Sequence, residues 1–462
     1  MIPQEAHMKH AIRLCTPNIL ARSEKAATGI LFLMMAGCCI FGSGRVLSFG
    51  DVGLRMLLLA VLMVVSLPLI ISQWRQLAKN RYVQLVALFF LWLAVSAVIG
   101  FARGNDSSLL LTDLKGFGYF LFLIPALCVL NSHKRIMGLM KLILYSSGVL
   151  ALLHIGTFIS YLIDPFRTEW FLLEFLQSHL GWLDKINFTM TRLFFRSVVY
   201  LICGCGFALY FYVYKEKKLR YPLLAGLCLF AILLSYTRSI YFGVAIAAFL
   251  CIVCILLQGN AQQRKRLISF AALTLTLFLL ITAVFSLTQK EDYLGFAFDR
   301  VFSLEHTPAE SAQRTLSVHL LRASTSLEDY LESSKESDLL RAQTIEEMVA
   351  KFWDSPLFGS GLGIHWDVRA ETGGISEYFY LDLLAKTGII GFGLYLSPIL
   401  YTVFLWLKKG TDPTKMIWMN VLFGFLAVSY FNPYMNSSLG ILFYCCSISA
   451  FCANAPQPQT NI

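Results

Sequence analysis

Long apolar runs recur along almost the whole chain, and they restrict the fold more than any other feature. Runs of about 17 to 25 residues can each cross a hydrocarbon layer of about 30 Å as a helix. Unbroken runs such as 54–71 differ from the short alternating segments of a membrane barrel. With 57% hydrophobic and 14% charged residues, a water-soluble protein of this length could not bury its apolar surface. The sequence therefore predicts an all-α integral membrane protein.

Twelve apolar runs are predicted to span the membrane, and they lie at 26–43, 54–73, 82–102, 110–131, 137–163, 196–214, 221–237, 240–258, 267–287, 378–407, 415–431 and 437–454. An even number of spans places both ends of the chain on one side. The predicted organisation comprises an N-terminal tail (1–25), spans one to nine (26–287), a large loop with an amphipathic helix (288–376), spans ten to twelve (377–454) and a C-terminal tail (455–462).

Lysine and arginine gather in alternate connections, which predicts the orientation. The cation-rich connections lie around residues 9–25, 75–81, 134–141, 215–220, 264–266 and 408–415. By the positive-inside rule these connections and both tails are cytoplasmic, and the loop 288–376 is periplasmic. The same bias explains the net charge of +10, so nucleic-acid binding is not predicted. The polar residues before the first apolar run are not typical of a cleavable signal, so we expect the first span to remain as a signal anchor.

The twelve cysteines lie almost entirely inside apolar runs. This placement predicts neither a disulfide framework nor a zinc site, because no loop carries cysteine or histidine at metal-ligand spacing. We therefore expect no metal and no cofactor.

The large loop contains a segment with helical periodicity between Arg341 and Trp353. Its apolar residues recur on one face, and Pro356 ends the helix. This pattern predicts an amphipathic helix that either lies along the outer interface as a roof over a cavity or packs on the top of the bundle.

A glycine-rich turn and a second helix follow. Gly359, Gly361 and Gly363 alternate along the turn, which is typical of a structural turn and lacks the spacing of a nucleotide-binding loop. Binding of phosphate by the amides of this turn is the alternative. Glu377 then opens a helix on which Gly388 and Gly391 share its face. An acid at a helix N-terminus can be a capping residue, or it can serve a site at the outer membrane edge.

At 341–391 the pattern resembles the region shared by bacterial O-antigen ligases and Wzy-type polysaccharide polymerases. That family shows an arginine, a Pro-Leu-x-Gly-x-Gly-x-Gly turn and a helix in which a histidine followed by Asn, Ser or Gln is separated by nine residues from Gly-x-x-Gly. This chain matches the pattern at Arg341, at the turn 356–363 and at Gly388 and Gly391. It departs from the pattern at residue 377, where glutamate replaces the histidine. The segment 234–239 also resembles the family, as does the layout of 200–462.

The resemblance implies a GT-C-type glycosyltransferase fold with a large periplasmic loop between the ninth and tenth spans. It implies an inverting, metal-independent reaction at the periplasmic face of the bacterial inner membrane, between a glycan donor on undecaprenyl pyrophosphate and a glycan acceptor. Guanidinium groups suit a pyrophosphate anion, and a carboxylate can take the acceptor proton. The candidate catalytic residues are Glu377 and Arg238, and the candidate substrate-binding residues are Arg192, Arg196, Arg300, Arg314, Arg341, His365 and Tyr380. The alternative for the arginines at span ends is that they contact the phosphate groups of membrane lipids and not the substrate.

Three functions remain in competition. The glutamate at 377 favours a Wzy-type polymerase, which would make O-antigen or exopolysaccharide, because histidine is expected at that position in ligases. An O-antigen ligase transferring glycan to lipid A core is the first alternative, and a flippase of repeat units is the second. A transporter should carry mid-membrane charges and short outer loops. Membrane lipid and a chain-length regulator are further candidate partners.

Overall fold

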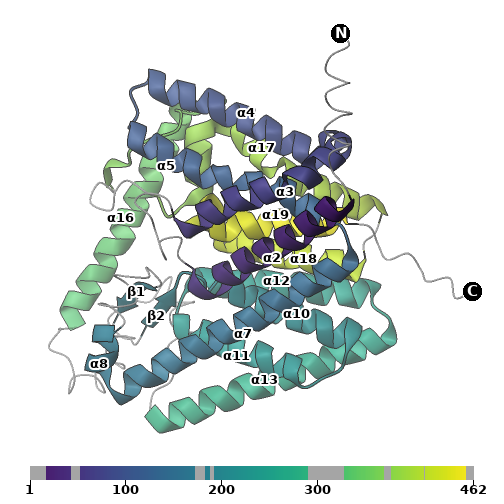
Figure 1. Ribbon diagram of the computed structural model, residues 1–462. Coiled ribbons are helices and arrows are strands. Elements are labelled where there is room, and N and C mark those ends of the chain that lie inside the picture. Colours follow the sequence, from purple (N-terminus) through teal and green to yellow (C-terminus); the bar gives the residue numbers. More distant parts are fainter. Residues whose placement is uncertain are drawn as a thin grey trace, which may run out of the picture.

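The computed structural model is a helical bundle whose long helices run side by side (Figure 1). It describes residues 17–42, 53–171, 183–187, 192–289, 327–368, 376–409 and 412–453. The helices in the first half are α2 (Pro17–Phe41), α3 (Leu54–Lys79), α4 (Arg81–Ala102), α5 (Ser107–Gly118), α6 (Leu123–Val129), α7 (His133–Ile163) and α8 (Pro165–Trp170). Those in the second half are α10 (Tyr200–Tyr210), α11 (Arg220–Ser235), α12 (Arg238–Gln258), α13 (Ala261–Gln289), α16 (Leu327–Asp354), α17 (Phe379–Lys409), α18 (Pro413–Val428) and α19 (Ser438–Cys452).

Single-turn and short elements complete the described chain. A 3-10 turn, η1 (Tyr119–Phe122), joins α5 to α6; a π-helical turn, η4 (Phe211–Lys215), ends α10; and a 3-10 turn, η6 (Pro433–Asn436), precedes α19. Strands β1 (Leu183–Asn187) and β2 (Arg192–Phe195) form an antiparallel pair. The prediction of an entirely helical chain missed this pair, because each strand is only four or five residues long.

Each of the twelve apolar runs coincides with helix. Eight helical segments of the described chain are long and apolar enough to cross a membrane, and α11, α18 and α19 are shorter apolar helices. The helices extend beyond the predicted spans: α2 begins within the predicted tail, at Pro17, and α13 continues to Gln289. The protein is therefore an α-helical membrane protein, and the count of twelve stays a prediction.

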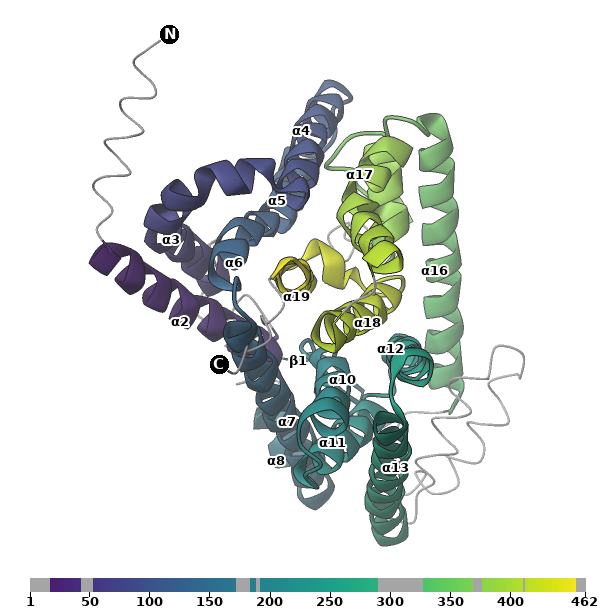
Figure 2. The same ribbon diagram turned by 90° about the vertical axis from the view of Figure 1, so that its right-hand side faces the viewer.

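The short helix α19 lies at the centre of the bundle, surrounded by α2, α3, α6, α17 and α18 (Figure 2). Every residue from Ser438 to Phe451 is buried. Stacked rings hold it there: the centroids of Phe443 and Phe425 on α18 are 4.5 Å apart, and those of Phe443 and Trp418 are 5.4 Å apart. A helix enclosed by protein need not match the thickness of the lipid, which accounts for its length of 15 residues.

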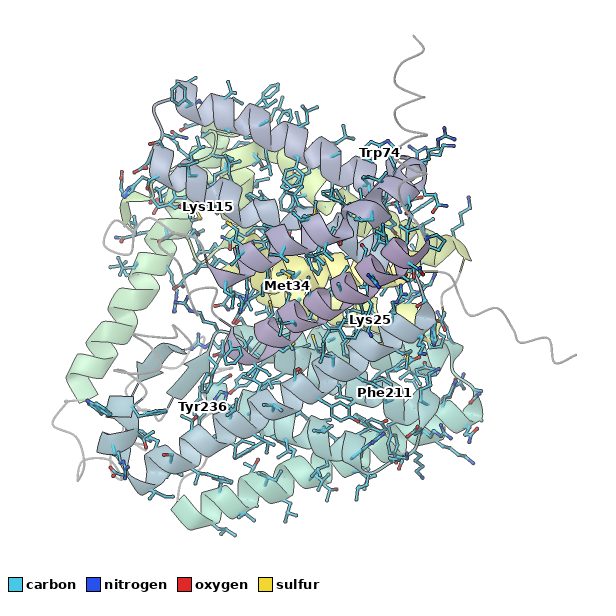
Figure 3. The ribbon with its side chains drawn as sticks, viewed as in Figure 1. Lys25, Met34, Trp74, Lys115, Phe211 and Tyr236 are labelled. Atoms are coloured by element: carbon cyan, nitrogen blue, oxygen red, sulfur yellow. The ribbon has the colours of Figure 1, made fainter. Side chains whose placement is uncertain are left out.

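The two ends of the bundle carry different segments. Lys25, Trp74 and Phe211 lie toward the right in Figure 3, whereas Lys115 and Tyr236 lie toward the left. We call the right-hand end, where α2 begins, the tail end, and the left-hand end, which carries α8, α16, β1 and β2, the loop end. At the tail end Arg135 of α7 forms an ion pair with Glu24 of α2. The cation-rich connections near residues 25, 75 and 215 thus share one end, as their charge predicted.

Helix α16 runs crosswise over the loop ends of the long helices (Figure 1). It begins before Arg341, where the sequence predicted its start, and it ends at Asp354 just before Pro356. Met348 is buried and Ile345 and Phe352 pack beside it, while Trp353 on the other side is 69% exposed. The helix therefore packs on the bundle with one face and leaves an apolar edge outside, as expected at a membrane interface.

Candidate functional site

Glu377 and Arg341 lie together at the loop end. Arg341 Nε is 3.8 Å from Glu377 Oε2, and the two side chains are 41% and 31% exposed. At this separation the groups form an ion pair without a direct hydrogen bond. A partly exposed pair of this kind contributes only about 0–1 kcal/mol to folding. A contribution to folding stability therefore does not explain why these two residues are paired. Because both side chains are partly exposed, both are accessible to a substrate.

A small apolar cluster places the pair. Met348 of α16 packs with Trp366, Tyr378 and Ala385, and Trp366 is fully buried. This cluster joins α16 to the residues just before and within α17. Glu377 is two residues before the first residue of α17, and Ser376 Oγ accepts a hydrogen bond from the Tyr378 amide at 2.9 Å. Glu377 was predicted to open this helix, and it instead lies on the bend that leads into it.

The glycine-rich turn is buried against α4 and α17. Gly359, Gly361 and Gly363 all have positive φ, at 78°, 89° and 80°. A Cβ atom at Gly361 would lie 2.2 Å from the Gly100 nitrogen of α4, and one at Gly359 would lie 2.4 Å from the Lys386 carbonyl oxygen. Glycine is needed at these positions for conformation and for close backbone contact.

The amides of this turn are used within the protein. Those of Gly359, Ser360, Gly361 and Leu362 donate to the carbonyl oxygens of Ser355, Ala385, Lys386 and Ser96 at 2.8–3.0 Å, and that of Gly363 donates to Asp113 Oδ2 at 2.9 Å. Amides engaged in this way cannot cradle a phosphate. Between the two alternatives for this motif, the geometry therefore favours the structural turn.

Helix α17 is broken at Gly388, where the sequence predicted a continuous helix. Gly388 has φ 67° and ψ −176°. The break brings its backbone against the turn, because a Cβ at Gly388 would lie 2.2 Å from the Leu357 carbonyl oxygen. The Ile389 amide donates to the Pro356 carbonyl oxygen at 2.9 Å. Gly388 thus serves the docking of the turn rather than helix-to-helix packing along one face.

Arg238 is exposed at the first position of α12, two residues after the left-handed residue Tyr236, which lies at the loop end (Figure 3). Its neighbour Ser239 is hydrogen bonded through Oγ to the Asn432 amide group. The segment that contains Asn432 also carries Tyr430, whose ring centroid is 6.4 Å from that of Tyr380 in α17. The start of α12 is therefore linked, through residues 430–432, to the start of α17 near Glu377.

The other predicted arginines lie in less defined places. Arg196 is half-buried in the turn after β2, beside Gly42 at the end of α2. Arg192 begins β2 opposite Asn187, and only its backbone is described. Arg300 and Arg314 lie outside the described residues.

The two remaining candidates are engaged with neighbours. The Tyr380 hydroxyl donates to the Leu426 carbonyl oxygen at 2.8 Å, and its ring packs against Phe379 and Phe392. These contacts indicate that Tyr380 contributes to packing between helices. His365 Nδ1 lies 3.5 Å from Asp367 Oδ1, and the histidine side chain is 42% exposed.

The loop end also contains an ion cluster that sequence analysis missed. Lys386 lies between Asp113 and Asp382, and all three side chains are at least 84% buried. Two signals were present in the sequence: Asp382 and Lys386 are four residues apart on a helix, and Asp113 falls inside a predicted span. Nearby, the pKa of Asp106 is lowered, chiefly because its carboxylate accepts the Leu109 and Ser108 amides at the start of α5.

Metal-ligating side chains do not gather in the described ranges. Within them, no three or more histidine, cysteine, aspartate or glutamate residues are arranged to hold a metal ion. The cysteines described are free, and most of them are buried in the bundle.

Comparison with known proteins locates the family signal in the same region. A family model described as O-antigen ligase matches residues 223–396, which is less than half of the chain and includes α12, α13, α16 and the Glu377–Arg341 pair. No curated protein matches the sequence. The family match agrees with the resemblance recognised at 234–239 and 341–391, so this part of the membrane protein is similar to O-antigen ligases.

Proposed function

We propose that this protein is a glycosyltransferase that polymerises undecaprenyl-pyrophosphate-linked repeat units into O-antigen or exopolysaccharide. The family match supports a membrane enzyme of the ligase and polymerase type. The observation that carries the proposal is the pairing of Glu377 with Arg341, a carboxylate and a guanidinium 3.8 Å apart and both partly exposed. The positive-inside rule assigns the tail end to the cytoplasm, so the loop end with this pair would face the periplasm.

The pair fits an inverting transfer. A hydroxyl of the acceptor sugar loses its proton to the Glu377 carboxylate while its oxygen forms a bond to the anomeric carbon of the donor. The bond from that carbon to the pyrophosphate oxygen breaks, and undecaprenyl pyrophosphate leaves with the bonding electrons. A positioned base contributes about 10²–10⁴-fold to such a step, and fixed cations near the leaving group stabilise the charge that develops there.

Arg341 and Arg238 are the cations we assign to the pyrophosphate. Arg341 adjoins the base, and Arg238 is exposed at the same end of the bundle. Arg196, which follows β2, is a third candidate. Permanently charged groups of this kind can balance a diphosphate directly, which is consistent with the metal-independent reaction that we propose.

The polymerase is preferred to the ligase because of residue 377. The resembling ligases carry histidine there, and this chain carries glutamate. Transport of the repeat unit is less favoured by the structure: the break in α17 and the buried ions beside it are occupied by protein hydrogen bonds, whereas a transporter uses such features for its cargo.

We expect the glycans of a strain that lacks this protein to identify its function. Loss of a polymerase should leave a single repeat unit on the lipid A core, which electrophoresis and mass spectrometry of the lipopolysaccharide would show. Polymer that is not attached to core would contradict the polymerase and indicate a ligase. Repeat units that remain on the cytoplasmic face would indicate a transporter. The wild-type gene, supplied in trans, is the control.

Replacement of Arg238 by alanine should lower polymer yield by about ten- to a hundredfold, because a charge-assisted contact contributes about 1.5–3 kcal/mol. The measurement is polymer per unit of membrane-inserted protein. Arg103, an exposed cation that follows α4 and lies outside the matched region, provides the control Arg103→Ala, for which we expect no loss. Equal yields from the two variants would remove Arg238 from the site.

A further inference from the structure

The ion cluster beneath the turn is connected to three segments of the chain. Lys386 Nζ lies 2.8 Å from Asp113 Oδ1 and 2.9 Å from Asp382 Oδ2. Asp113 belongs to α5, whereas Asp382 and Lys386 are one turn apart in the first part of α17. The side chains are 16%, 11% and 9% exposed, so the cluster is almost completely removed from solvent.

The second oxygen of each carboxylate holds the segment between α16 and α17. Asp113 Oδ2 accepts the Gly363 amide at 2.9 Å, and Asp382 Oδ1 accepts the Trp366 indole N–H at 2.8 Å. Each carboxylate therefore bonds the Lys386 ammonium with one oxygen and residues 363–366 with the other. The cluster fixes this segment to α5 and α17 at the same time.

The same segment determines where α16 lies. Trp366 packs with Met348 of α16 and with Tyr378, the residue after Glu377. From α16, Glu347 accepts the amides of Asp367 at 2.9 Å and Val368 at 3.4 Å. A displacement of residues 363–368 would therefore move α16, and Arg341 with it, relative to Glu377.

Stability alone is a poor explanation for this cluster. Burying an ammonium and two carboxylates carries a large desolvation cost, and well-packed apolar residues commonly stabilise a fold as well or better. The charged groups instead fix the relative positions of the segments, because each hydrogen bond has a defined donor, acceptor and geometry.

We propose that Asp113, Asp382 and Lys386 form a positioning unit that sets the approach of Arg341 to Glu377. These residues do not touch substrate in this proposal; they act through the segment 363–368. The inference rests on the function proposed above, since it assigns the pair a common substrate.

The variant Asp113→Asn tests the unit with the least disturbance. Gly363 and Lys386 donate to different oxygens of Asp113, and asparagine replaces one of these oxygens with an NH2 group, so one of the two donors loses its acceptor. Lys386 keeps Asp382 as its counterion, so the buried ammonium is not left without an acid. The fold should persist while the link between α5 and residues 363–366 weakens.

Cross-linking measures the approach directly and does not require activity. A variant that carries both Arg341→Cys and Glu377→Cys should react with a short bifunctional thiol reagent in membranes. Each of the two single substitutions gives the background from native thiols. Adding Asp113→Asn should lower the cross-linking rate severalfold. Adding Glu24→Gln, which breaks the ion pair at the tail end, should leave the rate unchanged.

Kinetics of the otherwise native chain provide the second readout. With purified lipid-linked repeat units, Asp113→Asn should lower kcat by about a hundredfold, as a misplacement of about 1 Å can do. KM should change little, because ground-state binding is retained. A merely structural role would reduce the amount of active protein without changing the cross-linking rate of the folded fraction.

A second variant keeps the proposal testable if Asp113→Asn does not fold. Trp366→Phe retains an aromatic ring in the cluster and removes the indole N–H that bonds Asp382. An unchanged cross-linking rate and kcat in the variant that folds would overturn the positioning unit. If cross-linking falls but Glu377→Gln and Arg341→Ala remain fully active, the positioning is supported and the proposed function fails.

Discussion

Replacement of Glu377 by glutamine should abolish glycan polymer while leaving the protein in the membrane at its normal level. Glutamine has nearly the same shape as glutamate but cannot accept the proton of the acceptor hydroxyl, and removal of a positioned base costs about 10²–10⁴-fold. The side chain is 31% exposed and its ion pair contributes little to stability, so folding should be preserved. Polymer length and yield per unit of protein are the measurements.

Two further substitutions separate the base from other roles of this position. Glu377→His should retain part of the activity, because imidazole can also accept a proton. Glu346→Gln removes a carboxylate from the exposed side of α16 and should have no effect. Normal polymer from Glu377→Gln would show that another group accepts the proton.

The sequence was sufficient to predict elements whose signal is local. An apolar run long enough to span lipid must form a helix there, so each of the twelve predicted runs coincides with helix. The stop of α16 before Pro356 was predicted for a similarly local reason, since proline cannot continue a helix. Charge patterning also indicated which connections lie at the same end of the bundle.

Features that depend on contacts between distant residues could not be predicted. The glycines at 359–363 indicated a turn, but only the structure shows that its partners are Ser96 and Gly100 of α4 and Lys386 of α17. The break at Gly388 has the same origin, because the turn occupies the space that a continuous helix would need. In the site, the sequence motif indicated Glu377 and Arg341 as separate candidates and did not predict that they are close. The packing of Met348 on Trp366 and Tyr378 brings the two residues together.

Replacement of Gly361 by alanine should largely eliminate folded protein. Gly361 has φ 89°, and an added Cβ would lie 2.2 Å from the nitrogen and 2.4 Å from the Cα of Gly100. The left-handed conformation costs about 1–2 kcal/mol for a residue with a side chain, and overpacking adds about 1–3 kcal/mol. The colliding atoms are backbone on both sides, so neither can rotate away. The measurement is the monodisperse fraction and its thermal denaturation after extraction in detergent.

Substitutions at two other glycines distinguish the cost of the left-handed conformation from the cost of the steric clash. Gly104 has φ 76° but no atom within 4 Å of an added Cβ, so Gly104→Ala should show only the conformational cost. Gly100 has helical geometry, and its Cβ would lie 2.2 Å from the Leu362 carbonyl oxygen, so Gly100→Ala should show only the clash. If the contact with α4 holds the turn, Gly100→Ala will destabilise the protein more than Gly104→Ala. The reverse order would mean that the turn, and the pair it helps to place, do not depend on α4.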